Sequence, residues 1–456
     1  MKNNSIKYIY IFSFFLLIGL TGCDDMLEAE LPINELSSEV VYASDPTAEA
    51  TINGIYQSMV TNTYYNSLHT ILGQTSDELI LKTQLSNVYT TNEMIDTDSS
   101  AGTMWTEFYK TIYNANNAII GISGSKTLTP TKAKQWIAEA KFLRAYSYFY
   151  LTNLWGDVPL VLTTNIDETS LAPRNTQTEI YNQIILDLKE AATDLPADFS
   201  GYSAIRVRAT KAAAQALLSR VYLYLGNWTE ASDLATLVIN DSSNYKIITG
   251  LTSTNSPFIA DNKEAILQIP YSNVTYTYEG SALFSSSGTY MLRNGNTLFE
   301  TGDARKTNWT GTTVAADGLT YTIPRKYKNS YTTTPVERST ILRLAELYLI
   351  RAEARVKLND ITGAQQDINV IRNRALLGNT TLTDSNQLLE LIALERQREL
   401  FAENGHRWFD LKRTGKIDEV LSTTPGKIWA STDSLFPIPE TARRSNPFLT
   451  QNLGYN

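Results

Sequence analysis

Apolar residues recur with the period of an amphipathic helix along most of the sequence. Ala48, Ile52, Ile55 and Met59 are three or four positions apart, which places their side chains on one face of a helix. Pro196 closes the last of the longer stretches with this period. Those stretches are residues 105–119, 136–150 and 180–195. The pattern predicts a mainly helical protein.

Two segments repeat one helix–turn–helix pattern. Residues 209–240 and residues 339–374 each contain a helix rich in small and apolar residues, a short turn, and a second helix. Aligning the two turns places Ala231 opposite Ala364, at the point where paired helices approach closely. The pattern resembles the tetratricopeptide repeat. Because one such unit cannot bury its apolar face alone, we expect several units to stack.

Two insertions interrupt the helical period, at residues 62–102 and 246–334. Both are rich in Thr, Ser, Asn, Gly and Tyr, so we expect strands and loops that lie on the helical frame. Each belongs to one half of the folded chain, and the halves span residues 39–245 and 246–456. Binding residues occur more often on such loops than on the scaffold, so the insertions are the candidate ligand face.

The first 22 residues have the pattern of a secretory signal. Lys2 and Lys7 precede a largely apolar run over residues 8–20. That run is about 20 Å long as a helix, whereas the hydrocarbon core of a bilayer is about 30 Å thick. We therefore predict a removable signal peptide over residues 1–22 rather than a membrane span.

The next residues indicate a lipid anchor. Leu20-Thr21-Gly22-Cys23 resembles a bacterial lipobox, in which cleavage before Cys23 leaves that residue to be acylated as the first of the mature chain. Two or more acyl chains hold a protein stably on a membrane. Residues 23–38 would then contain the lipidated cysteine and a polar tether. Asp24 and Asp25 resemble the surface-export signal of Bacteroidetes lipoproteins, with a solvated linker as the alternative interpretation.

Charge and residue usage exclude several classes of function. Lys and Arg total 39 against 47 Asp and Glu, a formal net charge of −8, which does not fit a nucleic-acid-binding surface. Cys23 is the only cysteine, and His69 and His406 are the only histidines, so intramolecular disulfides and Cys-rich zinc sites are excluded. The 26 tyrosines supply flat side chains with a polar tip, which suit stacking on ligands.

No motif of a common catalytic or phosphate-binding type occurs. G-x-S-x-G, P-loop, G-x-G-x-x-G and H-E-x-x-H sequences are absent. Glycosidase chemistry needs only two carboxylates; Asp77-Glu78 is such a pair, although adjacent acids are more often a solvated turn or a helix start. The run from Asp96 to Glu107 resembles a calcium loop whose Gly comes one position late. We interpret it as a helix cap before Trp105, and we expect no metal and no cofactor.

The densest sequence signal is ERQRELFAENGHRWFDLKRTGK, at residues 395–416. Glu395 and Arg398 have i,i+3 spacing, and Glu403 and Arg407 have i,i+4 spacing, so we expect two ion pairs here. Asn404-Gly405 predicts a helix end, with the next helix beginning at Arg407. We interpret the segment as an ion-paired corner of the scaffold rather than as a binding site.

Three segments together resemble the signatures of one family. They are residues 395–416, AKFLRAYSYFYLTNLWGDVPLVL at residues 140–162 and FPIPETARRSNPFLTQNLGY at residues 436–455. With the lipobox and the repeat helices, they resemble the SusD/RagB-type nutrient-binding lipoproteins of Bacteroidetes, in the family's order along the chain. The resemblance implies a tetratricopeptide-like frame with an irregular ligand face. It also implies an outer-membrane location and a partner, a SusC-like TonB-dependent transporter that takes up oligosaccharides or, in some members, peptides.

The two insertions supply candidate ligand contacts. A sugar offers C–H faces to aromatic rings and hydroxyls to polar side chains, and family members tend to carry their ligand aromatics in these insertions. Trp309 lies in a polar loop, so we expect Trp309→Ala to weaken glycan retention and to leave thermal stability nearly unchanged. The candidates are Trp309, Tyr276, Tyr278, Tyr290 and Arg293 from the second insertion and Tyr89 and Asn92 from the first.

The sequence therefore favours a non-enzymatic, surface-anchored lipoprotein that binds a glycan and delivers it to a SusC-like transporter. Two alternatives stay open. One is a glycoside hydrolase with an unrecognised carboxylate pair, and the other is a peptide-binding RagB-like uptake lipoprotein. Tyr, Thr and Asn in the insertions favour a sugar ligand.

Overall fold

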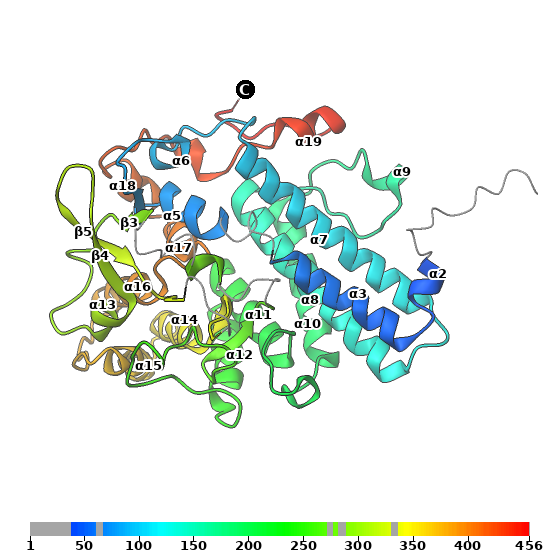
Figure 1. Cartoon of the computed structure of the whole chain (residues 1–456), viewed down its shortest axis with the longest axis horizontal. Coiled ribbons are helices and arrows are strands. Elements are labelled where there is room, and N and C mark those ends of the chain that lie inside the picture. The colour runs from blue at the N-terminus through cyan, green and yellow to red at the C-terminus, as the bar shows by residue number, and fades with distance from the viewer. Residues whose placement is uncertain (1–37, 61–66, 271–276, 281–288, 330–335, 456) are drawn as a thin grey trace, which may run out of the picture.

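A computed structural model describes residues 38–60, 67–270, 277–280, 289–329 and 336–455 (Figure 1). The predicted signal peptide, Cys23 with nearly all of its tether, and Tyr276 lie outside the described residues. The described part is mainly helical with a few short strands, as the hydrophobic period predicts.

The N-terminal part is built on three long helices. α8 (Pro130–Trp155) packs between α7 (Ser99–Gly124) and α10 (Gln177–Asp194). The second half of α8, from Phe142 onward, is buried on every face, so its apolar and aromatic residues do not follow a one-sided pattern. α3 (Asp45–Ser58), which follows the short α2 (Ser38–Val41), packs on α7 and α8.

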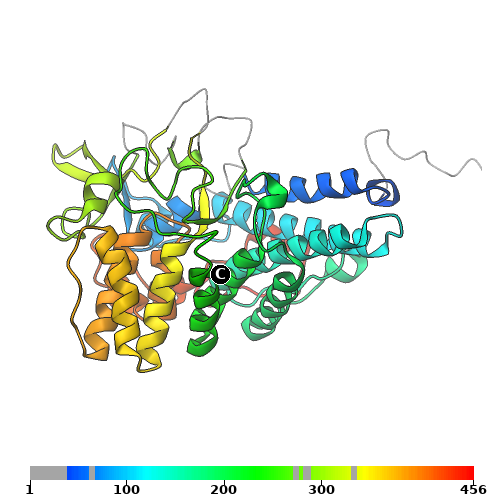
Figure 2. The ribbon, with the colours of Figure 1, turned by 90° about the horizontal axis from the view of Figure 1, so that it is seen from below.

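Two helix pairs correspond to the two repeated sequence segments. α11 (Lys211–Leu225) packs on α12 (Trp228–Asn240), and α14 (Leu344–Lys357) packs on α15 (Ile361–Arg374). α12 also packs on α14, although the second insertion separates them in sequence. With α16 (Ser385–Leu400), these helices stand side by side (Figure 2). The predicted stacking of repeat units is confirmed.

The close approach inside each pair depends on a small residue. Ala231 of α12 and Ala364 of α15 are fully buried. The Ser219 hydroxyl of α11 donates a hydrogen bond of 2.7 Å to the Ala231 carbonyl. A larger side chain at either alanine would force the paired helices apart, because protein interiors are close-packed.

Short strands join segments that are far apart in sequence. β1 (Leu79–Leu81) pairs antiparallel with β3 (Tyr290–Leu292), with Leu81 opposite Tyr290. This pair links the first insertion to the second. Two further antiparallel pairs are β4 (Thr310–Val314) with β5 (Thr320–Pro324) and β2 (Ala265–Gln268) with β6 (Thr340–Arg343).

The first insertion also contains short helices, whereas the sequence predicted only strands and loops there. These helices are too short to show a hydrophobic period, and in α6 local capping marks the start. The Asn87 side chain, for example, accepts hydrogen bonds from the backbone N–H groups of Tyr89 and Thr90 at the start of α6. Besides α2, the short helical elements of the described chain are η2 (Ser67–Ile71), α5 (Leu72–Thr75), α6 (Val88–Thr91), α9 (Ile166–Thr169), η3 (Ser200–Tyr202), α13 (Ala304–Trp309), α17 (His406–Arg413), α18 (Ile417–Leu421), η5 (Ser431–Ser434) and α19 (Glu440–Ser445).

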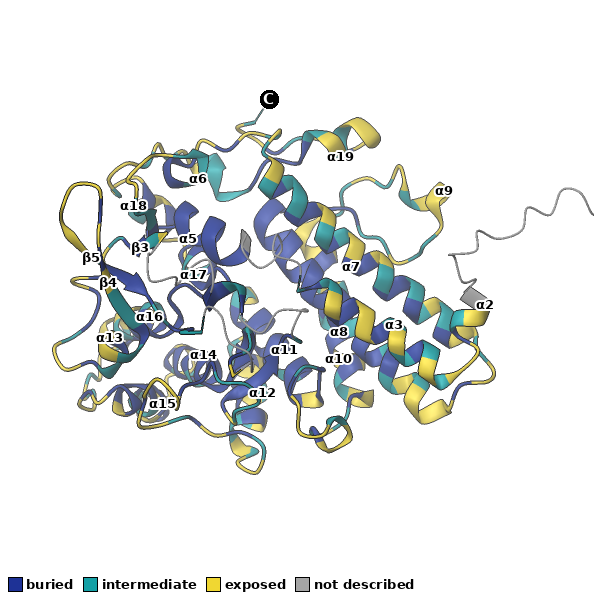
Figure 3. Cartoon of the chain, in the orientation of Figure 1, coloured by how far each residue is buried: buried dark blue, intermediate teal, exposed yellow. Residues whose placement is uncertain are grey.

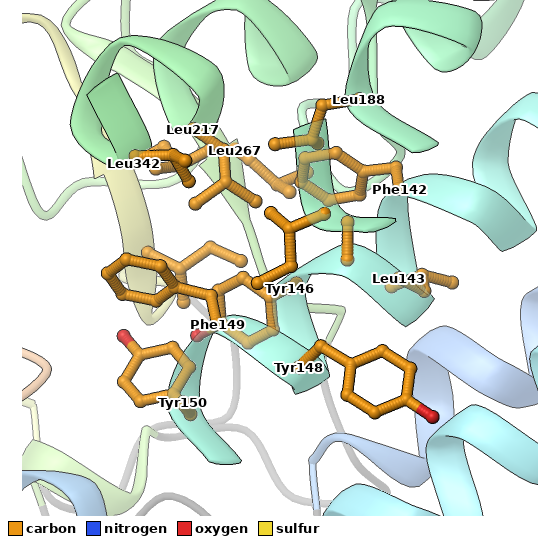
Figure 4. Packing of buried hydrophobic residues seen from close by; sticks show 14 of the residues in the cluster. Phe142, Leu143, Tyr146, Tyr148, Phe149, Tyr150, Leu188, Leu217, Leu267 and Leu342 are labelled. Atoms are coloured by element: carbon orange, nitrogen blue, oxygen red, sulfur yellow. The ribbon is translucent and has the colours of Figure 1, made fainter. Parts of the chain in front are cut away.

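One large hydrophobic core extends along the helices. It includes residues from Tyr42 to Leu449, and buried positions run along most helices in Figure 3. Figure 4 shows Phe149 of α8 in one cluster with Leu217 of α11 and Leu342 of β6. Fully burying a side chain of this size contributes about 1.5–3 kcal/mol. The core therefore fixes the frame on which the insertions lie.

Buried charges hold the C-terminal end of α16. Arg343 lies 2.5 Å from Glu399, and Arg374 also pairs with it. Burial by itself raises the pKa of Glu399, but Arg374 and Arg343 outweigh it and hold that pKa well below its usual range. Glu395 pairs with Arg398 at 3.1 Å, as their spacing predicts. The interpretation of this segment as ion-paired scaffold is confirmed.

Glu403 does not pair with Arg407, contrary to the prediction. α16 ends before Glu403 and α17 begins after it, so the two residues are not on one helix. Glu403 instead binds Arg343 at 2.8 Å and also pairs with Lys326. Arg407 binds both carboxylate oxygens of Asp77, at 2.7 and 2.8 Å.

Candidate functional site

Trp309 lies in the protein interior, so the prediction that it is an exposed ligand platform is wrong. It ends α13 and is 0% exposed, with the Phe258 ring 5.6 Å away and the Arg374 guanidinium 4.8 Å from its ring centre. The polar residues around it form the outer side of a short helix, which the Asp303 side chain caps at the Arg305 N–H. Its burial also removes the basis for expecting that Trp309→Ala leaves stability nearly unchanged.

The two insertions meet at the β1–β3 pair. Arg293, directly after β3, donates its backbone N–H to the Glu78 carbonyl at 2.9 Å. On the other side of β1, the chain continues into α6, which carries Tyr89. Tyr89 from the first insertion is therefore in the same region as Tyr290 and Arg293 from the second, although about 200 positions separate them in the sequence.

Three half-buried tyrosines lie near one another at this junction: Tyr89 of α6, Tyr278, and Tyr290 of β3. Burial raises the pKa of the Tyr89 and Tyr278 hydroxyls, and the nearby Tyr290 adds to both shifts. The Tyr89 hydroxyl donates to Asp98, which caps α7. We call these three residues the tyrosine face. Their contact with a ligand stays a prediction.

Asn92 lies behind this face rather than on it. Its side chain is 2% exposed and donates a hydrogen bond of 3.0 Å to the Thr75 carbonyl at the end of α5. Its backbone has φ of 67°, the left-handed conformation that ends α6 and that Asn tolerates. Asn92 therefore positions α6 and Tyr89, and the expectation that it contacts a ligand directly is corrected.

Arg293 and Lys427 lie together beside the tyrosine face. The Arg293 guanidinium donates a hydrogen bond of 2.7 Å to the Pro425 carbonyl. The Lys427 ammonium donates to the carbonyls of Thr75 at 3.0 Å and Tyr89 at 3.4 Å. Sequence reasoning found Arg293 but missed Lys427, because a single lysine in a polar loop carries no signal of its own.

The carboxylates of Asp77 and Glu78 are both buried, so the prediction of a solvated turn is wrong. Each residue is 6% exposed. Asp77 is held by Arg407, and burial raises the pKa of Glu78 to about 8. Asp77 therefore ties the start of β1 to α17, and Glu78 accepts a hydrogen bond from the backbone of Ala402 in the turn before α17.

The segment from Asp96 to Glu107 is a helix start, as predicted. The Asp98 side chain accepts hydrogen bonds from the N–H groups of Ser100 and Ala101, and Asp96 pairs with Arg443 at 2.9 Å. A hollow of about 340 Å³ lies between this helix start and α19. Within the described ranges, His, Cys, Asp and Glu side chains form no group of three that could hold a metal ion.

Two sequence models of one family match most of the chain. The model described as "Starch-binding associating with outer membrane" matches residues 29–223, and the model of the SusD family matches residues 260–455. The chain belongs to the SusD family.

Curated relatives match most of the chain. The SusD-like protein P2 of Formosa agariphila is 28% identical over 100% of both chains. The starch-binding protein SusD of Bacteroides thetaiotaomicron is 25% identical over 78% of this chain and 79% of its own.

Solved structures share the fold. A SusD-like protein of Bacteroides fragilis superposes with a TM-score of 0.76 at 23% identity, over 93% of this chain and 100% of that one. A laminarin-binding SusD-like protein gives a TM-score of 0.73 at 24% identity, over 91% and 100%. In the part of our chain that the structure describes, every helix is too short or too polar to cross a membrane.

Proposed function

We propose that this protein binds a glycan at the tyrosine face and delivers it, without catalysis, to a SusC-like TonB-dependent transporter. The observation that carries the proposal is the tyrosine face itself, formed where the two insertions meet on a rigid helical frame. Half-buried tyrosines can present a ring face to sugar C–H groups, while the Tyr89 hydroxyl donates to Asp98 and holds its ring in place. A site held by packed helices is largely formed before the ligand arrives.

The family and its relatives support a carbohydrate as the ligand. One matched family model is described as starch-binding, and one structural neighbour is a laminarin-binding protein. We expect affinities in the micromolar to millimolar range, about −4 to −8 kcal/mol. Weak binding suits a protein that must release its ligand to a transporter.

The location follows from the predicted lipid anchor on Cys23. The same family model is described as associating with the outer membrane, which supports an anchored protein. Acyl chains on Cys23 would hold the protein on the outer membrane, and Asp24-Asp25 would direct it to the cell exterior. This orientation would expose the tyrosine face to polysaccharides outside the cell.

The proposal is tested by native affinity gels with a panel of polysaccharides and oligopeptides. The protein used is Met26 to Asn456, which lacks the lipid. Retardation by one glycan, with no shortened product, supports the binding function and names the nutrient. Product formation would overturn it in favour of a glycoside hydrolase, and retention by peptides alone would overturn the glycan as ligand.

A further inference from the structure

Two cations beside the tyrosine face have no carboxylate partner among the described residues. Arg293 donates to the Pro425 carbonyl, and Lys427 donates to backbone carbonyls that include those of Thr75 and Tyr89. Arg293 and Lys427 are half-buried, and cations that are partly removed from water are normally paired with acids. The chain holds 47 Asp and Glu against 39 Lys and Arg, so a shortage of acids does not explain the missing partners.

The surrounding charged groups do not compensate for these cations. The Asp77 carboxylate attracts both cations electrostatically, but Arg407 binds both of its oxygens. Glu78 has a pKa raised to about 8 by burial, so it is largely neutral at pH 7. Asp98, next to Tyr89, accepts a hydrogen bond from the Tyr89 hydroxyl and from the backbone N–H groups at the start of α7. The local charge is therefore positive.

Partial burial makes these positive charges costly in the free protein. It lowers the pKa of Lys427 to about 7, and the nearby Arg293 adds to that shift. Burial also lowers the pKa of Arg293. Backbone carbonyls offer dipoles but no net charge. An anion placed here would favour the charged form of both side chains.

The two cations border the tyrosine face and reach the surface. Arg293 follows β3 directly, three residues after Tyr290, and Lys427 binds the carbonyl of Tyr89 itself. Pro425, beside Arg293, is exposed. Figure 1 shows β3, α5, α6 and α18 gathered in this region. A ligand on the tyrosine face can therefore extend to the cations.

We propose that the tyrosine face takes an acidic glycan, with the carboxylate of a uronic acid or a sulfate ester of one sugar lying against Arg293 and close to Lys427. The inference rests on the proposed glycan-binding function and adds the substrate class. A guanidinium presents parallel N–H donors that match both anions. The anion would supply the counter-charge that the described residues lack.

Calorimetry with three oligosaccharides of similar length tests the substrate class. The probes are a neutral laminarin oligosaccharide, an oligogalacturonate and a sulfated carrageenan oligosaccharide. We expect one acidic probe to bind at least tenfold more tightly than the neutral one, and to weaken as NaCl rises from about 0.05 to about 0.5 M. Which acidic probe binds tells carboxylate from sulfate. Tighter binding of the neutral probe would overturn the acidic class and leave glycan binding standing; binding of no glycan would overturn both.

Arg293→Gln separates a ligand contact from a structural role. We expect about a tenfold loss of affinity for the acidic probe, because a charge-assisted hydrogen bond is lost, and an unchanged affinity for any neutral glycan. Lys263→Gln is the matched control, since Lys263 also donates to a backbone carbonyl, that of Ser243. Equal losses with acidic and neutral glycans would overturn the proposal.

Proton uptake gives a second measurement that needs no change at Arg293. Near pH 7.5, an anion beside Lys427 should raise the pKa of its ammonium, so binding should take up a fraction of a proton. Calorimetry in two buffers of different ionisation enthalpy measures that uptake. We expect Lys427→Gln to reduce this uptake but not to abolish it, because Glu78, with a pKa of about 8, also titrates in this range. If the wild-type protein binds an acidic probe without proton uptake, the claim that the anion lies close to Lys427 is overturned.

Discussion

Among single residues, Trp309 illustrates how charge and apolar packing act together. Phe258 packs edge-on to its ring, and Arg374 and Lys326 lie 4.8 and 5.1 Å from the ring centre. Trp309→Ala would leave a cavity and remove these contacts, so we predict a loss of about 3–5 kcal/mol in the free energy of unfolding. Denaturant titration measures it, with the half-buried Trp429→Ala as control. A loss no larger than that of the control would contradict the prediction.

His406 is expected to make stability depend on pH. Burial lowers the pKa of His406 to about 4, from 6.5 for an ordinary histidine. Between these values the unfolded state binds more protons than the folded state. The stability that His406 contributes is therefore present above pH 6.5 and is lost as the pH falls toward 4.

A variant isolates this effect from other groups that titrate in the same range, such as Glu78. Between pH 7 and pH 4.5, His406→Gln should gain about 2 kcal/mol in stability relative to the wild-type protein. Urea unfolding of both proteins at several pH values measures the difference. A difference that does not change with pH would contradict the prediction.

At the scale of elements, the turn between α16 and α17 packs tightly on α5. Gly405 has φ of 72°, and a Cβ there would lie 2.2 Å from the Leu72 side chain of α5. Gly415 has a similar φ of 67° but nothing within 4 Å. Gly415→Ala therefore carries backbone strain alone, about 1–2 kcal/mol. We predict that Gly405→Ala costs about 1–3 kcal/mol more because of the clash.

Thermal and denaturant unfolding of the two glycine variants compare these costs. Because α5 also carries the carbonyls that hold Asn92 and Lys427, Gly405→Ala should weaken ligand binding as well. Equal destabilisation of the two variants would contradict the packing of the turn against α5.

The long elements could be predicted from the sequence, whereas the junction that forms the site could not. Ala231 and Ala364 identified the repeat pairs because a helical period extends over many residues. The β1–β3 pair has three residues on each strand and joins distant segments, so no local pattern reveals it. Trp309 was misplaced for a related reason, since the polar residues around it mark the outer side of a short helix as well as they mark a loop.

At the scale of the whole molecule, the lipobox predicts where the protein resides. Cys23→Ala should shift the protein from the membrane fraction to the soluble fraction, because the acyl chains have no other attachment site. Asp24→Asn with Asp25→Asn is the matched control for export: it should keep the anchor and reduce digestion by protease added to intact cells. Continued pelleting of Cys23→Ala with membranes would contradict the lipoprotein assignment.

The most direct test of glycan binding at the tyrosine face is the affinity of Tyr290→Ala for the glycan that the wild-type protein retains. Removing one stacking ring should weaken binding about tenfold, as measured by calorimetry. Tyr113→Ala, at a 50% exposed position on α7 outside the tyrosine face, should bind as the wild-type protein does. Unchanged affinity of a folded Tyr290→Ala variant would contradict the account and place the ligand elsewhere.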